Sequence, residues 1–110
     1  MINVIKNGNY EIYKLIICND EVGYIETIPN LDYLEITDVL IYEKYRSKGY
    51  SKVLLDYIIN NTKYNRFLLE VSVNNEVAIS LYKKYAFKKI STRKNYYKDG
   101  SDALIMEMVR

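Results

Sequence analysis

A single acidic side chain interrupts an apolar, strand-like segment of the chain, where it could take part in proton transfer. Glu70 lies within the run FLLEVSV, and partial burial would make such a carboxylate a better general base. The chain has no histidine, which excludes Ser-His-Asp and Cys-His catalysis and any His-ligated metal site. Proton transfer would therefore depend on carboxylate, tyrosine, lysine or water. The alternative is that Glu70 only marks the solvated side of its strand.

Tyrosine hydroxyls are the other groups of this chain that could donate a proton, and the sequence alone singles out none of them. Tyr82, twelve residues after Glu70, lies on the apolar face of a predicted helix, where its ordinary role is core packing with the hydroxyl at the rim. Tyr96 and Tyr97 are, by themselves, ordinary members of a chain with 13 tyrosines.

A short basic loop, RSKGYS at positions 46–51, stands between an apolar strand and a predicted helix. Such a loop directs free backbone N–H groups and the positive end of the helix dipole toward one place, which suits a pyrophosphate. Gly49 would allow close approach of the backbone, Ser51 is small, and Arg46 and Lys48 add positive charge. Taken alone, the pattern is explained better by an ordinary basic loop before a surface helix.

The elements that would hold these residues alternate between strand and helix periodicity. Strands are predicted at 10–18, 22–28, 34–42, 67–73, 87–92 and 103–109, the first two forming a hairpin around Asn19-Asp20. Helices are predicted at 51–61 and from the N-cap Asn75 to about residue 85. The order β-β-β-α-β-α-β-β indicates an α/β fold with a mixed, mostly antiparallel sheet and at least one parallel crossover.

The length and composition limit what kind of protein this is. A chain of 110 residues can form one domain with one core, and its net charge of +2 is too small to indicate a nucleic-acid partner. No apolar run reaches the length of a membrane span. The single cysteine, Cys18, excludes an internal disulfide and is expected to be buried on the hairpin. We therefore expect a cytoplasmic protein with no nucleic-acid, membrane or metal partner.

Three blocks in order resemble the signatures of the GNAT acetyltransferase superfamily. RSKGYS after an apolar strand resembles its Arg/Gln-x-x-Gly-x-Gly/Ala loop for acetyl-CoA, and LEVSVNNEVAISLYKKYAF resembles its second signature. RKNYYKDGSDALIMEM is similar to the tail of the N-terminal acetyltransferases, especially the ribosomal-protein alanine N-acetyltransferases. The three blocks span residues from about 34 to 110. The resemblance implies a GNAT-like fold, with a splay between the third and fourth predicted strands, and acetyl-CoA as co-substrate.

The resemblance also implies a role for each matching residue. Glu70 falls where the family places its general base and Tyr82 where it places its general acid. Tyr96 and Tyr97 match a pair that grips the backbone of the acceptor. The expected cofactor-binding residues are Val39, Leu40 and Ile41 along the pantetheine arm, Arg46, Ser47, Lys48, Gly49, Tyr50, Ser51 and Lys52 around the pyrophosphate, and Asn75 across the splay.

The resemblance implies a reaction that transfers an acetyl group from acetyl-CoA to an amine. The acceptor that we expect is the α-amino group of a protein or peptide N-terminus. A lysine or small-amine acceptor and a non-catalytic CoA-binding module are the alternatives. Relative to the family, residues 1–110 would form one domain without the usual first strand and two helices, and Ala86 replaces a usual glycine. The apolar sheet surface left uncovered predicts a homodimer.

Overall fold

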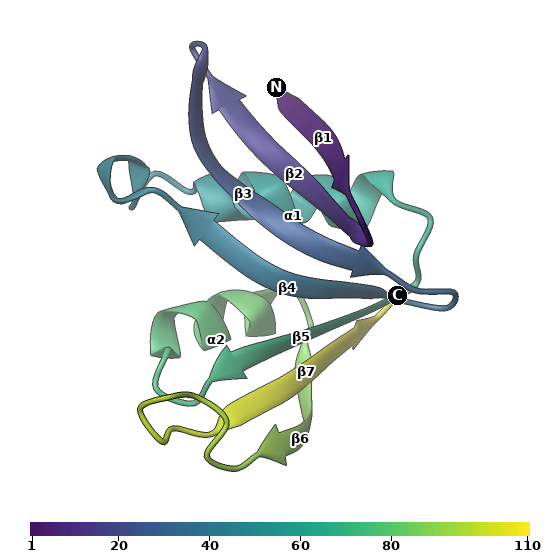
Figure 1. The fold of residues 1–110 in the computed structure, drawn as a ribbon, viewed down its shortest axis with the longest axis vertical. Coiled ribbons are helices and arrows are strands. Elements are labelled where there is room, and N and C mark those ends of the chain that lie inside the picture. The colour runs from purple at the N-terminus through teal and green to yellow at the C-terminus, as the bar shows by residue number, and fades with distance from the viewer. The chain divides into compact units, whose positions relative to one another are not determined.

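The first half of the chain folds into an antiparallel sheet with one helix on its face. The computed structural model describes residues 1–110, of which residues 1–64 form one unit and residues 65–110 another. The first unit contains the strands β1 (Ile2–Asn7), β2 (Tyr10–Ile17), β3 (Asp20–Pro29) and β4 (Leu34–Ile41), each antiparallel to the next. A short 3-10 helix, η1 (Glu43–Tyr45), then leads to the helix α1 (Tyr50–Asn61) (Figure 1).

Two-residue turns connect the first three strands. Asn7 pairs with Tyr10 across a turn in which Gly8 has a φ of 61°, as expected when glycine occupies the first central position of a type II′ turn. The strand β1 that precedes this turn is not among the predicted elements. Its six residues, INVIKN, mix polar and apolar types, and they become a strand by pairing with β2.

The turn between β2 and β3 corrects the expectation for Cys18. Ile17 pairs with Asp20, so Cys18 and Asn19 are the two central residues, with φ values of 51° and 69°. Positive φ at both central positions is the geometry of a type I′ turn, whose twist matches that of the flanking strands. Cys18 is therefore exposed at the tip of the hairpin, and the prediction that it is buried on a strand is wrong.

One face of the first sheet packs on α1. Alternate residues of a strand point to the same face, and the strands bury Tyr13, Leu15, Val22, Ile25, Leu34, Ile36 and Ile41 on this side. Leu54, Leu55 and Ile58 of α1 are completely buried, and α1 contacts β2, β3 and β4. The opposite face carries half-buried residues such as Ile12, Ile16, Tyr24 and Leu40. This face has no helix of its own unit on it.

The second unit is a three-stranded antiparallel sheet with one helix. It contains β5 (Arg66–Ser72), α2 (Glu76–Lys84), β6 (Lys88–Arg93) and β7 (Ala103–Val109), with β7 paired to both other strands. The alternation of β5 buries Phe67, Leu69 and Val71. The other buried apolar residues of this unit are Tyr82, Phe87, Ala103, Met106 and Met108. Glu70 thus falls on the face of β5 that is turned away from this core.

Hydrogen bonds cap both ends of α2 and hold the residues that flank the helix. At the start, the N-cap Asn75 accepts a hydrogen bond at Oδ1 from the N–H of Ala78 (3.2 Å). At the end, Ala86 adopts a φ of 67°, and the N–H of Phe87 donates to the carbonyl of Tyr82 at 3.1 Å. Together with a bond from Ala86 N–H to the Lys83 carbonyl (3.0 Å), this is a Schellman motif.

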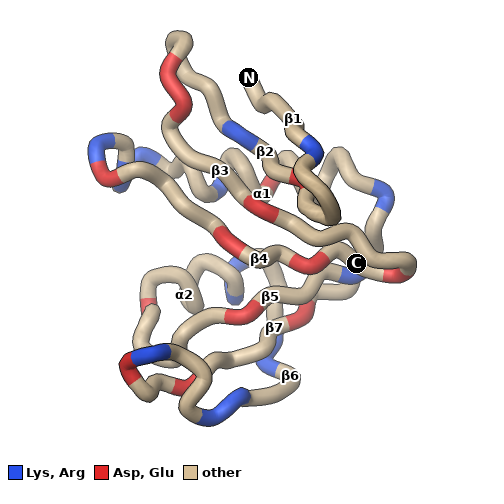
Figure 2. The backbone as a smooth tube through the Cα atoms, viewed as in Figure 1, with Lys and Arg blue, Asp and Glu red and all other residues tan.

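The α/β class and the eight predicted elements are confirmed, each with ends within two residues of those observed. The predicted splay would lie between β4 and β5, which belong to different units, and it stays a prediction. Acidic residues lie along β3 and β4, β2 carries one acidic and one basic residue, and basic residues gather on the connection before α1 and around β6 (Figure 2). No helix is long and apolar enough to cross a membrane.

Candidate active site

The predicted pantetheine strand β4 is the last strand of the first unit's sheet. The N–H of Tyr42, just after β4, donates to the carbonyl of Val22 at 3.0 Å. Because the direction of backbone groups alternates along a strand, Leu40 also directs its N–H and C=O toward β3. Val39 and Ile41 direct theirs toward the other edge. Of the three predicted residues, these two therefore carry the backbone groups that do not pair with β3.

Two contacts hold the end of β4, where the chain turns into the basic loop. The Nε of Arg46 donates to the carbonyl of Ile41 at 2.9 Å, so the predicted anion-binding arginine folds back on the strand. The hydroxyl of Tyr42 donates to the Glu21 carboxylate. That hydrogen bond raises the pKa of Tyr42 to about 12 and lowers the pKa of Glu21, so at neutral pH the tyrosine is a hydrogen-bond donor to an ionised carboxylate.

The basic loop exposes its backbone at the start of α1. Ser47 and Gly49 both have positive φ, 65° and 80°, and Gly49 is the N-cap of the helix. The first intrahelical bond runs from Val53 N–H to the Gly49 carbonyl, so the N–H groups of Tyr50 and Ser51 point out of the helix end. No acidic residue lies in the first turn. The positive end of the helix dipole is therefore uncompensated within the helix.

Space around this helix start is open. A side-chain Cβ added at Gly49 would meet no heavy atom within 4 Å, and Arg46, Ser47, Lys48 and Gly49 are all exposed. Lys52, in the first turn of α1, is exposed as well. The backbone at Gly49 is therefore not covered by other atoms on the side where a Cβ would project.

Glu70 lies in the second unit and has a basic neighbour. Its Oε1 is 3.6 Å from the Nε of Arg93, and its side chain is 24% exposed. Arg93 comes from β6, so the ion pair spans the intervening strand β7. The sequence analysis did not connect these two residues, because only the register of the three strands brings them together.

The pair Tyr96 and Tyr97 lies in the loop between β6 and β7. Their rings meet edge to face with centroids 5.0 Å apart. Several short contacts order this loop: the N–H of Asn95 donates to Asp102 Oδ1 at 2.9 Å, and the N–H of Gly100 donates to the Tyr97 carbonyl at 2.9 Å. Burial raises the pKa of Tyr97, with smaller contributions from the negative charge of Glu70 and from Tyr96. Tyr97 therefore keeps its proton at neutral pH.

Tyr82 is nearly buried, with 7% of its surface exposed. Its ring packs at 5.8 Å from that of Phe87, and the Schellman motif joins the backbones of the same two residues. Tyr82 is therefore held in place both by its ring and by its backbone. The predicted cofactor contact Asn75 uses its Oδ1 to cap α2, and its Nδ2 is not part of that cap.

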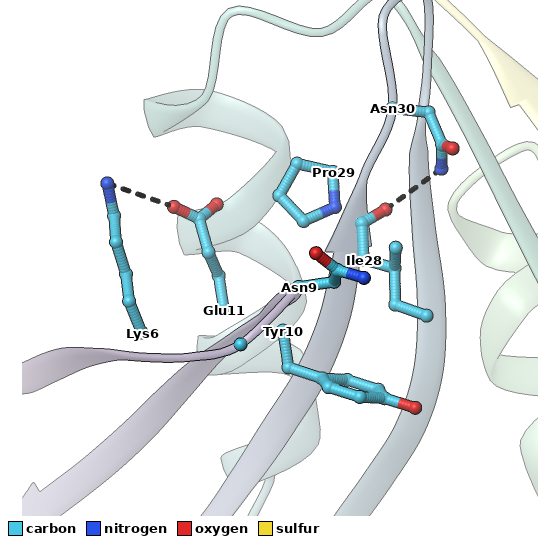
Figure 3. Close-up of a pocket in the computed structure, with 8 residues that line it drawn as sticks. Lys6, Asn9, Tyr10, Glu11, Ile28, Pro29 and Asn30 are labelled. Carbon is cyan, nitrogen blue, oxygen red and sulfur yellow. Dashed lines mark hydrogen bonds and ion pairs between the residues drawn. The ribbon is translucent and has the colours of Figure 1, made fainter.

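A polar hollow of about 480 Å³ lies elsewhere in the first unit, beside the β1–β2 turn (Figure 3). Its lining residues are Lys6, Gly8, Asn9, Tyr10, Glu11, Ile28, Pro29 and Asn30. Lys6 and Glu11, which lie opposite each other in the β1–β2 pairing, form an ion pair at 3.8 Å on one side of it. None of the residues predicted to do chemistry lines this hollow. No group of three or more cysteine, aspartate and glutamate side chains lies together in a way that could hold a metal ion.

Comparison with known proteins assigns the chain to a family. A family model described as an acetyltransferase (GNAT) domain matches residues 1–110. An N-alpha-acetyltransferase of Saccharolobus solfataricus is 35% identical over an alignment of 118 positions. The alignment covers 93% of this chain and 71% of that protein. Two further curated relatives are matched over 45% of their length. The chain belongs to the GNAT acetyltransferase family.

Solved structures agree with this assignment. The crystal structure of the ribosomal-protein-S18-alanine N-acetyltransferase from Escherichia coli matches with a TM-score of 0.87 and 26% identity, covering 94% of this chain and 71% of that one. A GNAT family acetyltransferase from Elizabethkingia anophelis, with acetyl-CoA bound, matches in fold with a TM-score of 0.85 and 23% identity, over 93% of this chain and 77% of that chain. The resemblance inferred from the three sequence blocks is confirmed.

Proposed function

We propose that the protein transfers an acetyl group from acetyl-CoA to the α-amino group of a protein or peptide N-terminus. The family match over residues 1–110 is the observation that carries this proposal, because it includes both the basic loop and the segment with Glu70. The names of the relatives, an N-alpha-acetyltransferase and a ribosomal-protein alanine N-acetyltransferase, support a protein N-terminus as the acceptor. The single cysteine supports a reducing, cytoplasmic setting.

The geometry of the first unit fits a pyrophosphate-containing cofactor. Positive φ at Ser47 and Gly49 bends the loop into the start of α1, whose free N–H groups are an arrangement that binds anions. The open space at Gly49 allows phosphate oxygens to approach those groups. Arg46, Lys48 and Lys52 would add positive charge, and Val39 and Ile41 would bind the pantetheine amides. When bound, acetyl-CoA would supply an acetyl group activated as a thioester.

In the second unit, Glu70 would accept a proton from the attacking amine. An α-amino group has a pKa near 8, so at neutral pH much of it carries a proton that must be removed before it can attack. The Oε atoms of Glu70 could take that proton directly or through one water molecule. Tyr82 would give its hydroxyl proton to the departing sulfur, and Tyr96 and Tyr97 would hold the backbone of the acceptor.

An assay with matched peptides tests the proposed acceptor. Each peptide is offered with acetyl-CoA in two forms, one with a free N-terminus and an acetylated internal lysine, the other with a blocked N-terminus and a free lysine. We expect mass spectrometry to find acetylation of the first form only. Acetylation of the second form alone would make the protein a lysine acetyltransferase. If calorimetry detects acetyl-CoA binding and no peptide reacts, the chain is a CoA-binding module.

A further inference from the structure

Arg93 has a place in the second unit that its neighbours in the sequence do not reveal. In the paired register, Glu70 of β5 lies opposite Ile105 of β7, and Ile105 lies opposite Ser91 of β6. These three residues form one row across the sheet and share a face. Arg93 lies two positions beyond Ser91 and therefore points to that same face. Only a long side chain can span β7 to reach Glu70, because two strand spacings amount to roughly 10 Å.

The guanidinium of Arg93 makes two contacts at once. Its Nε lies 3.6 Å from Oε1 of Glu70, and its Cζ lies 5.5 Å from the ring centroid of Tyr96. Tyr96 in turn meets Tyr97 edge to face. The four side chains thus form one continuous cluster, from the carboxylate on β5 to the loop between β6 and β7.

The charges around Glu70 on this face are few. Arg93 approaches from β6, and Tyr97, whose hydroxyl keeps its proton, approaches from the loop. The other charged residues on this face of β5, β6 and β7 are Arg66 and Glu107, which bind each other, and Lys88, which lies opposite Glu107 in the strand register. Arg93 is therefore the cation that acts on the Glu70 carboxylate.

We propose that Arg93 is a positioning residue for acetyl transfer, holding the Glu70 carboxylate and the Tyr96 ring in a fixed relation. This inference rests on the proposed function, in which Glu70 accepts the proton and the tyrosine pair holds the acceptor. Arg93 thereby couples the orientation of the Glu70 carboxylate to the position of the Tyr96 ring, which would hold the acceptor backbone. The flat guanidinium suits this double contact, because it can pair with a carboxylate and stack on a ring, which an ammonium group does less well.

Substitution of Arg93 by methionine and by lysine separates charge from shape. Arg93→Met keeps an apolar stem, and we expect kcat/KM for a peptide to fall about fivefold to tenfold, the range set by one partly exposed ion pair and one exposed cation–π contact. The loss should divide between a lower kcat, from the Glu70 contact, and a higher peptide KM, from the Tyr96 contact. Arg93→Lys keeps the charge, so it should restore kcat while the peptide KM stays raised. Arg66→Met, on the same face, is the matched control and should leave both unchanged.

A double-mutant cycle tests whether Arg93 acts through Glu70. In a Glu70→Gln background, Arg93→Met should lower kcat by less than twofold, because its carboxylate partner is already gone. Equal losses of kcat in both backgrounds, or a failure of Arg93→Lys to restore kcat, would overturn the positioning role while leaving the proposed function intact. If the unaltered protein acetylates no peptide, the proposed function fails instead. The same cycle on the free energy of unfolding, measured in urea, then decides whether the two side chains are coupled.

Discussion

Glu70 is the residue on which the proposed proton transfer depends. Replacing it by glutamine keeps the size of the side chain and removes the base, so we expect turnover on a peptide N-terminus to fall by one to a few orders of magnitude. The deficit should shrink as the pH rises past the pKa of the amine, near 8, because the amine then arrives already neutral. A steady-state pH profile from 6 to 10 measures this. Glu107→Gln, on the same face of the neighbouring strand, should retain full activity.

Tyr82→Phe should show a different pH dependence. The proposed role of the hydroxyl is to protonate the departing sulfur, a need that does not decline in alkali, so the loss of kcat should persist across the same pH range. Because the ring can still pack on Phe87, the free energy of unfolding should change by about 1 kcal/mol or less. Urea denaturation checks that point. A variant with normal kcat would leave Tyr82 as a core residue only.

The candidate residues themselves could be chosen from the sequence, but their neighbours could not. Glu70 was conspicuous as a lone charge in an apolar strand, and the basic loop contained its glycine at a helix start. The contact between Glu70 and Arg93 depends on strands separated in sequence by α2, and on a pairing register that no local pattern encodes. In the sequence, Arg93 is only one of several basic residues in that region.

At the scale of elements, the loop before α1 makes a specific prediction about ligand binding. Gly49→Val should abolish acetyl-CoA binding in calorimetry, because a branched side chain would fill the open space beside the N–H groups. Its φ of 80° should also cost about 1–2 kcal/mol of stability. Gly8→Val is a close control: Gly8 has a φ of 61° and equally open surroundings. It should lose similar stability and still bind acetyl-CoA normally.

The end of α2 predicts a stabilising substitution. Ala86 holds a left-handed conformation at the position where a Schellman motif usually has glycine. Glycine avoids a penalty of about 1–2 kcal/mol, of which about 0.4–1 kcal/mol is offset by the greater freedom of the unfolded chain. We therefore expect Ala86→Gly to raise the free energy of unfolding by roughly 0.5–1 kcal/mol in urea denaturation. Ala78→Gly, inside the same helix, should lower it by roughly 0.5–1 kcal/mol.

Burial of one face imposes a strand or helix periodicity on the apolar residues of an element. The elements with a buried face could therefore be predicted from the sequence. β1 was missed for a physical reason: its residues are mostly exposed, so no buried face imposes an alternation on them. The observed hairpin turn, Cys18-Asn19, lies one residue before the predicted turn, Asn19-Asp20. Both of its residues adopt positive φ although neither is glycine. Turn geometry of that kind is decided by the twist of the paired strands more than by the turn residues.

At the scale of the whole molecule, we expect self-association. The face of the first sheet opposite α1 carries half-buried Ile12, Ile16 and Leu40, and apolar surface of this kind favours an interface. Multi-angle light scattering should give about twice the monomer mass of 13.0 kDa. Ile12→Lys with Ile16→Lys should shift the protein to monomer. A monomer at all concentrations in the unaltered protein would contradict the prediction.

The exposed hairpin tip has a practical consequence for enzymology. Acetyl transfer releases a free thiol, and reagents that detect thiols would also react with Cys18, the only cysteine of the chain. Each protein molecule should then give one equivalent of colour that does not depend on substrate, which could be mistaken for a single turnover. Cys18→Ser should remove this background without altering the rate that follows. The same lone sulfur offers a unique attachment point for a fluorescent dye or a spin label.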